Sequence, residues 1–329
     1  PHNSNISKGQ MFSATSLRGK PIDAEYAEQR ARLEPLVEIT QYKGDSETHP
    51  ELSPNDEFAN FALYPWYIQK VRTNNYEAKP GDYVRSALKT GLELDGELGV
   101  NPYAFGVIGS TDSHTGLATA EEANFWGKMA TDSIPERKAL SRTPGVGGSA
   151  GGPTGWSMQA SGLAAVWADA NNREAIVSAM QRKEVYGTTG PRIRLRFFAG
   201  SNLMLDDLDR ADWHSHLIRK AVPMGGDLIN PPDSQPEFLI DATKDPLSAN
   251  LDRIQIVKGW LNESGVAEEK VFDVVWSNDR ALVDGKLPAL APEIDEKIGT
   301  WNVSQGAVSL RAVWRDPEFD ATQNAFYYA

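Results

Sequence analysis

Apolar and polar positions follow two different periods along the first half of the chain. The stretch IDAEYAEQRARL at residues 22 to 33 has helical spacing, and PLVEIT at residues 35 to 40 changes to a β-rich apolar run. A second helical pattern covers residues 82 to 99, and AFGVIGS at residues 104 to 110 has a second strand pattern. This alternation favours a parallel sheet with covering helices.

The same alternation continues further along the chain. SGLAAVWAD at residues 161 to 169 predicts a strand, and NREAIVSAMQRK at residues 172 to 183 predicts a helix. A short helix is also expected around residues 57 to 63. The glycine-rich stretch at residues 143 to 155 lacks the lysine of a phosphate-binding P-loop, so we interpret it as a surface loop.

From about residue 190 the pattern changes to short β-like runs separated by Gly, Pro, Asn and Asp, which is typical of a β-sandwich. One helical insertion, around residues 204 to 221, interrupts these runs. We therefore predict two domains, at residues 1–189 and 190–329.

The composition narrows the function classes. The 329 residues are 40% hydrophobic, enough for a sizeable core, and the net charge of −12 argues against binding to nucleic acid or to an anionic membrane surface. No apolar run is long enough to insert into a membrane. The sequence has no cysteine, so a metal ion would need histidine and carboxylate ligands. An anionic substrate would need local positive charge.

The stretch GVIGSTDSHTGLA at residues 106 to 118 ends a strand with an aspartate and a histidine two positions apart. Side chains two apart on a strand point to the same face, so Asp112 and His114 are candidates for a shared metal site. The alternative is a polar turn in which Asp112 caps a helix that begins near residue 119.

Other polar positions also admit two interpretations. His2 lies in an apparently exposed turn, and Glu38 is a carboxylate inside an apolar strand, where it needs either a partner or a solvent-facing position. The segment GDSETHP at residues 44 to 50 is either an acidic loop or part of a site. His214 and His216 diverge by about 200° on a helix, so we expect a solvated surface there.

Several longer motifs together resemble the DUF3604 family. They are PHNSNISKGQMF, EPLVEITQYKGDSETHP, NPYAFGVIGSTDSHTG, the run from residue 162 to residue 200, PMGGDL, LDRIQIVKGW and DPEFDATQNAFYY. That family is related to the polymerase-and-histidinol-phosphatase (PHP) superfamily of metal-dependent hydrolases. The resemblance implies the C-terminal part of a distorted (β/α)7 barrel, because the superfamily's earlier ligands do not occur before His2, and residues are expected upstream.

The resemblance also implies roles for individual residues. His2, Asp112 and His114 match metal ligands, in a cluster of about two or three Zn, Mn or Fe ions. Glu38 matches a supporting glutamate. Three residues of a family-specific motif are candidate acid/base groups or substrate contacts: Lys43, Glu47 and His49.

The resulting expectation is a metal-dependent hydrolase, with an anionic phosphate ester as the substrate and a metal-activated water as the nucleophile. Two alternatives remain open: hydrolysis of another ester or amide, and a non-catalytic module that binds carbohydrate or another ligand through some of the nine tryptophans. The sequence does not determine the oligomeric state or the compartment, and a periplasmic or secreted location requires a preceding signal peptide.

Overall fold

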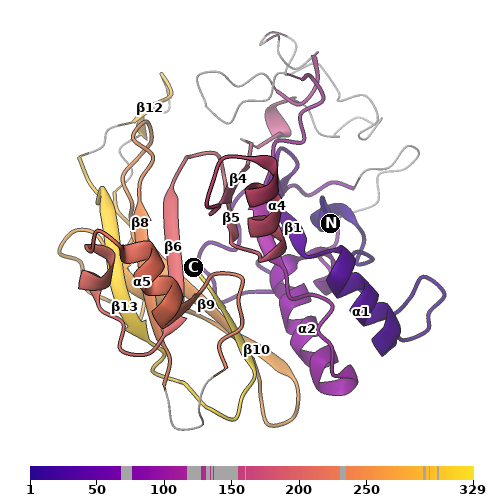
Figure 1. The fold of residues 1–329 in the computed structure, drawn as a ribbon. Coiled ribbons are helices and arrows are strands. Elements are labelled where there is room, and N and C mark those ends of the chain that lie inside the picture. The colour runs from indigo at the N-terminus through magenta and orange to yellow at the C-terminus, as the bar shows by residue number, and fades with distance from the viewer. Residues whose placement is uncertain are drawn as a thin grey trace. The chain divides into compact units, whose positions relative to one another are not determined.

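The protein consists of two compact units, of which the first contains residues 1–190 with 261–267 and the second contains residues 191–260 with 268–329 (Figure 1). The structure is a computed structural model. It describes residues 1–67, 76–116, 127–130, 134, 136, 155–159, 161–229, 235–291, 294–295, 297–301 and 304–329. The expected loop at residues 143 to 155 lies almost entirely outside these residues, as does most of the expected helix after residue 119. None of the described helices is long and apolar enough to cross a membrane.

The first unit is built around strands β1 (Leu36–Gln41) and β3 (Gly106–Gly109), which pair in parallel. Strand β2 (Gly44–Asp45) pairs antiparallel with the other edge of β1. Strands β4 (Leu163–Val166) and β5 (Val185–Thr188) form a separate antiparallel pair. Glu38 of β1 and Ile108 of β3 are partners in the register of this pair.

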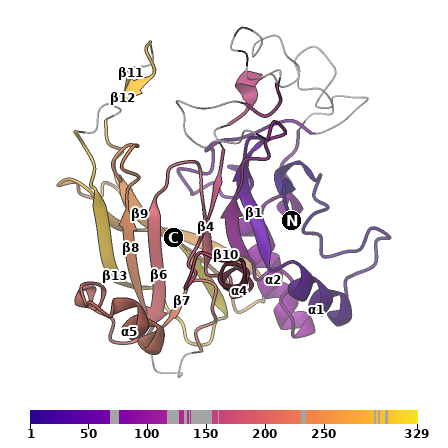
Figure 2. The same cartoon turned by 45° about the horizontal axis from the view of Figure 1, so that its top comes forward.

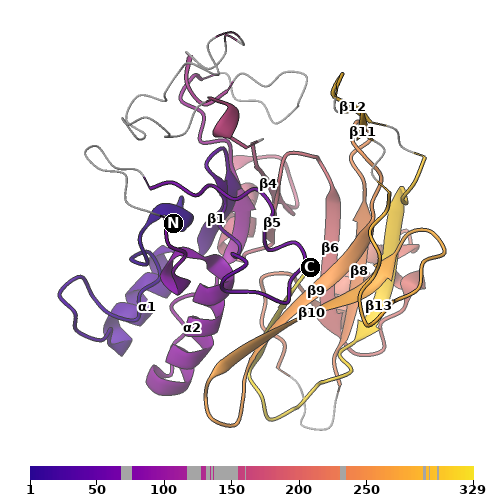
Figure 3. The ribbon, with the colours of Figure 1, turned by 180° about the vertical axis from the view of Figure 1, so that it is seen from behind.

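The described residues of this unit form three α-helices: α1 (Ala24–Leu33), α2 (Val84–Leu98) and α4 (Arg173–Gln181). Helix α1 begins where the Asp23 carboxylate accepts a hydrogen bond from the Tyr26 backbone N–H, and α2 ends at Gly99, which has a φ of 74°. The core between α2 and the two parallel strands consists of Phe12, Ile22, Val37, Val84, Ala87, Leu94 and Tyr103. Figure 3 shows α1 and α2 beside β1. The three helices predicted at these positions are confirmed.

Short 3₁₀ helices occur at Ser4–Ile6, Pro80–Asp82, Gly155–Ser157 and Leu205–Leu208. The short helix expected around residues 57 to 63 is absent, since that segment consists of turns.

The predicted (β/α)7 barrel is wrong. The described residues contain four α-helices and mostly antiparallel sheets, and no closed barrel. The periodicity of the sequence distinguishes helix from strand, but it does not give the direction of a strand, so the parallel arrangement was predicted wrongly. The elements β4, α4 and β5 occur in the order of a crossover unit, yet β4 and β5 are antiparallel. Gly162 explains part of this arrangement, since a Cβ atom there would lie 2.7 Å from the Thr40 carbonyl oxygen and 2.9 Å from Ser110 N. The absence of a side chain lets the start of β4 lie against the ends of β1 and β3.

The second unit contains a four-stranded antiparallel sheet in the order β13-β8-β6-β7 (Figure 2). Its strands are β6 (Arg194–Gly200), β7 (Ala221–Pro223), β8 (Glu237–Thr243) and β13 (Ser309–Arg315). A three-stranded sheet has the order β10-β9-β14, with bounds Ala267–Trp276, Arg253–Leu261 and Ala325–Tyr328. Strands β11 (Ile294–Asp295) and β12 (Thr300–Trp301) form a small pair.

The two larger sheets of this unit share one hydrophobic core. Strand β8 contributes Phe238, Ile240 and Ala242 to it, and Ile254 and Ile256 come from β9. On the other face of β8, Leu239 packs with Leu217 of helix α5 (Trp213–Lys220). This alternation is the period of two that the sequence shows for these strands.

A polar cluster joins α5 to the preceding 3₁₀ helix. The Asp207 carboxylate is bonded to His216 Nε2 at 2.8 Å and accepts hydrogen bonds from Lys220 Nζ at 2.7 Å and the Met204 N–H at 2.8 Å. His214 is exposed as expected, whereas His216 is partly buried and bound to Asp207 rather than fully solvated.

The Asp207→Asn substitution is expected to lower the free energy of unfolding at pH 7 by about 2 kcal/mol. Burial raises the pKa of Asp207, but the hydrogen bonds from Lys220, Met204 and His216 outweigh it and lower the pKa from 3.8 to about 2. A folded-state pKa below the unfolded value stabilises the protein above about pH 4, and this contribution disappears as the pH falls towards 2. Urea unfolding at pH 7 and pH 3 measures it. The exposed Asp206→Asn control should change little; an equal loss in both variants would contradict the prediction.

Candidate functional site

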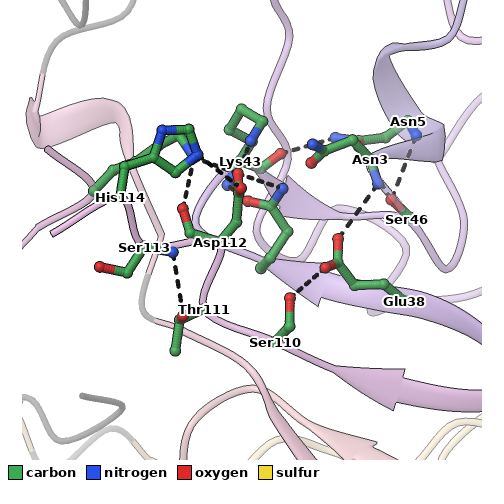
Figure 4. Close-up of polar contacts among 12 residues, drawn as sticks. Asn3, Asn5, Glu38, Lys43, Ser46, Ser110, Thr111, Asp112, Ser113 and His114 are labelled. Atoms are coloured by element: carbon green, nitrogen blue, oxygen red, sulfur yellow. Dashed lines mark hydrogen bonds and ion pairs between the residues drawn. The ribbon is translucent and has the colours of Figure 1, made fainter. Parts of the chain in front are cut away.

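The candidate site lies where the two parallel strands of the first unit end. Strand β1 ends at Gln41, with an irregularity in its pairing to β3 between Glu38 and Thr40, and β3 leads directly into residues 110 to 114. Because parallel strands end at the same edge of a sheet, the segment after β3 lies beside the segment after β1. Figure 4 shows the side chains of Lys43, Asp112 and His114 converging there.

The Asp112 carboxylate is the centre of this arrangement. Its Oδ2 atom accepts hydrogen bonds from the ammonium groups of Lys43 and Lys128, and from Gln41 Nε2 at 3.0 Å. Lys128 Nζ also donates to the Asp112 carbonyl at 2.6 Å. His114 Nε2 lies 3.2 Å from Asp112 Oδ1 and 3.1 Å from Lys128 Nζ. We call these five residues the Asp112 cluster.

The Asp112 cluster is buried on one side and open on the other. The side chains of Lys43 and Lys128 are 3% and 2% exposed, whereas that of His114 is 51% exposed. Burial and the Lys128 ammonium lower the pKa of Lys43 to about 7; Glu38 acts in the opposite direction, as does the direct contact with Asp112. Burial, Lys128 and Lys43 lower the pKa of His114, which is therefore neutral at pH 7.

Glu38 is almost fully buried and has partners. Its carboxylate accepts hydrogen bonds from the Ser110 hydroxyl and from the Asn3 backbone N–H at 3.3 Å, and its own N–H donates to the Pro1 carbonyl at 3.0 Å (Figure 4). Glu38 thus holds both the first residues of the chain and the end of β3. The supporting role in the site that the resemblance implies for it stays a prediction. His2, between two of these partners, is exposed.

Glu47 and His49 lie in other surroundings. Glu47 Oε1 accepts a hydrogen bond from Arg85 at 2.6 Å, and the His49 ring lies 5.8 Å from the ring of Tyr83. His49 Nδ1 accepts from the Glu51 N–H at 3.2 Å, and burial lowers the pKa of His49, although Glu51 raises it. These contacts attach the loop to helix α2. Of the three candidates from the family-specific motif, Lys43 is the one that the described contacts place in the Asp112 cluster.

Two members of the Asp112 cluster were not identified from the sequence. Gln41 has a detectable signal, because it ends β1 two positions before Lys43 and so belongs to the same strand end. Lys128 has none, since it lies in a stretch whose pattern predicted only an amphipathic helix.

The residues expected to bind metal are only partly brought together. Asp112 and His114 are adjacent, but within the described parts of the chain no group of three or more His, Asp and Glu side chains is arranged to hold a metal ion. Two donors are fewer than the three or four protein ligands of a zinc site, so these residues alone do not fit one. The assignment of His2 as a ligand stays a prediction.

Comparison with protein families gives a match over residues 1–329 to a family described as "Protein of unknown function (DUF3604)". The chain belongs to the DUF3604 family. The resemblance read from the sequence motifs is thereby confirmed for this family. No curated protein and no solved structure matches the DUF3604 chain, so its function has to be inferred from the Asp112 cluster itself.

Proposed function

We propose that the chain is a hydrolase that acts on phosphate esters at the Asp112 cluster. The observation that carries this proposal is the pairing of Asp112 with His114 beside two buried ammonium groups, those of Lys43 and Lys128. In a chain with a net charge of −12, Lys128 and the protonated fraction of Lys43, whose pKa is about 7, place positive charge at a strand end. Such charge is what an anionic ester needs for binding and for stabilisation of its transition state.

His114 supplies the proton acceptor. Its lowered pKa keeps the imidazole neutral at pH 7. In the tautomer with hydrogen on Nε2, the ring donates to Asp112 Oδ1, and Lys128 Nζ then donates to Asp112 rather than to the ring. Nδ1 can then accept the proton of an attacking water. Asp112 fixes the orientation of the ring, and the lysine ammonium groups neutralise the charge that develops on the phosphoryl oxygens.

We also propose that the chain is related to the PHP superfamily and that its activity depends on a divalent metal ion. These two points rest on the resemblance of its sequence motifs alone. Asp112 and His114 have the donor chemistry for such an ion but form an incomplete ligand set in the described residues. The dependence of hydrolysis on a metal ion is a property to be measured.

The His114→Gln substitution is expected to lower kcat for p-nitrophenyl phosphate by about 100-fold or more, the usual contribution of a general base. Hydrolysis is measured with the full chain, with added Zn²⁺ or Mn²⁺ and with EDTA, and phosphodiesters are included. The exposed His214→Gln variant is the control and should keep wild-type activity. Absence of turnover for every ester, with and without metal, would reject the hydrolase; ligand binding without turnover would favour the non-catalytic module.

A further inference from the structure

We propose that Gln41 is a positioning residue of the Asp112 cluster: its side-chain amide fixes the Asp112 carboxylate and, through it, the tautomer of His114. Gln41 is the last residue of β1 and is 2% exposed. The inference rests on the proposed function for the use of His114 as a base. The arrangement itself can be measured without turnover.

The amide of Gln41 is held at both ends, so its orientation is determined. Its Oε1 atom accepts a hydrogen bond from the Lys43 backbone N–H, and its Nε2 atom donates to Asp112 Oδ2 at 3.0 Å. A backbone N–H is only a donor, so the amide oxygen must face Lys43 and the amide nitrogen must face Asp112. Gln41 and Gly44 pair across β1 and β2, and the two-residue turn between them restricts the position of this N–H.

The other described donors to Asp112 Oδ2 do not define a direction in this way. They are the ammonium groups of Lys43 and Lys128. An ammonium group lies at the end of a flexible four-carbon chain, and its N–H groups rotate towards their acceptors. The lysines therefore attract the carboxylate, whatever further contacts they make, whereas the planar amide of Gln41 sets the angle at which Oδ2 is held. Oδ1 is thereby directed at His114 Nε2, 3.2 Å away.

His114 Nε2 lies near two groups that require different tautomers of the ring. With hydrogen on Nε2 the ring donates to Asp112 Oδ1, whereas with hydrogen on Nδ1 the Nε2 atom accepts from Lys128 Nζ at 3.1 Å. The His114 side chain is 51% exposed, so packing alone does not decide between the two. A carboxylate that is held by Gln41 favours the first tautomer, which leaves Nδ1 as the proton acceptor.

The test is nitrogen NMR of the histidine rings in the full chain at pH 7.5 with EDTA, where the His114 signals are those that disappear in His114→Gln. In the wild type, the hydrogen should reside on Nε2. The Gln41→Glu substitution keeps the shape and the acceptor for the Lys43 N–H but removes the donor to Asp112, so the ratio of the Nε2–H to the Nδ1–H tautomer should fall at least about tenfold. Hydrogen on Nδ1 in the wild type, or a wild-type ratio in Gln41→Glu, would overturn the inference.

The Gln41→Met variant adds no charge and should shift the tautomer ratio in the same direction. Because Gln41 acts through Asp112, the ratio in Asp112→Asn should be the same with and without Gln41→Met. Ser46→Ala is the matched control, since it removes buried hydrogen bonds with Asn5 just after β2 and should keep the wild-type ratio. A shift in Ser46→Ala equal to that in Gln41→Met, or effects of Gln41→Met and Asp112→Asn that simply add, would overturn the inference.

Activity on the same samples separates the two proposals. If the chain hydrolyses p-nitrophenyl phosphate, Gln41→Met should lower kcat about tenfold and change KM less than about twofold, because Gln41 positions the base without contacting the substrate. Hydrolysis by the wild type with an unchanged kcat in Gln41→Met would support the hydrolase and reject the positioning role. A shift of the tautomer ratio in Gln41→Met, together with no ester hydrolysis by the wild type, would support the positioning of His114 and reject the hydrolase.

Discussion

The Gly109→Ala substitution is expected to lower the free energy of unfolding by about 3 kcal/mol, at the upper end of the range for overpacking. A Cβ atom at Gly109 would lie 2.7 Å from the Thr188 carbonyl oxygen and 2.8 Å from Leu163 backbone atoms. These are backbone atoms of β5 and of β4, which cannot rotate away as a side chain end could. The strands must separate, and residues 110 to 114 move with β3.

The Gly96→Ala variant is the matched control because it adds the same methyl group to the same unit. Gly96 lies inside helix α2, and its added Cβ would meet only Leu261 Cδ1 at 3.8 Å, an ordinary contact. Alanine in a helix is favoured over glycine by about 0.5–1 kcal/mol, so this variant should be more stable than the wild type. Denaturant unfolding of both variants measures the difference. Equal stabilities for the two would show that the strands around Gly109 pack less closely than described.

The Arg85→Met substitution is expected to cost about 3–5 kcal/mol, the usual effect of removing one partner from a buried ion pair. The Arg85 side chain is 2% exposed, and its Nη2 atom lies 2.6 Å from Glu47 Oε1 and 2.8 Å from Asp56 Oδ2. Asp56 is itself buried, so the substitution leaves an unpaired carboxylate. The backbone N–H of Arg85 still donates to the Glu47 carbonyl in this variant, so the loop should loosen around Asp56 rather than at residues 46 and 47.

Thermal unfolding and limited proteolysis measure the two consequences of this substitution. Arg182→Met is the control, since Arg182 is 44% exposed and pairs with Glu184 at the surface, where a pair contributes at most about 1 kcal/mol. A second variant, Arg85→Met with Asp56→Asn, removes the stranded charge and should recover part of the loss. If proteolysis within the loop is no faster in Arg85→Met than in Arg182→Met, then Arg85 does not hold the loop.

The positions of the helices and strands could be predicted from the sequence, but the way in which the strands pair could not. Amphipathic spacing located α1, α2 and α4, because each buries one face and bears recognisable end signals such as the cap at Asp23. The barrel prediction failed because strand direction depends on contacts between distant residues. The close approach of Gly109 to the backbones of Leu163 and Thr188 is a long-range packing requirement, which a local pattern does not contain.

The part of the candidate site that follows a strand end could be predicted from the sequence. The part that consists of lysine side chains from other segments of the chain could not. Asp112 and His114 were identified by a strand spacing, but β3 ends at Gly109 and Asp112 has a φ of 53°, so their contact arises in the turn after the strand. The two ammonium groups that contact Asp112 come from separate segments, and nothing in the local sequence around Lys128 indicates that its side chain is buried. The electrostatic character of the cluster was therefore beyond sequence reasoning.

The backbone at Asp112 has a consequence for how the site can change over evolutionary time. Asp112 has a φ of 53°, a left-handed conformation that glycine, asparagine and aspartate adopt at little cost. A single base change converts an aspartate codon into one for asparagine or glycine. The carboxylate can thus be lost in one step without backbone strain, although the buried amino groups of Lys43 and Lys128 then lose their shared acceptor. A change to valine at the same position adds backbone strain as well. In evolutionary descendants of this chain that keep the fold but lose the activity, we expect asparagine or glycine at position 112 while Lys43 and Lys128 are still present.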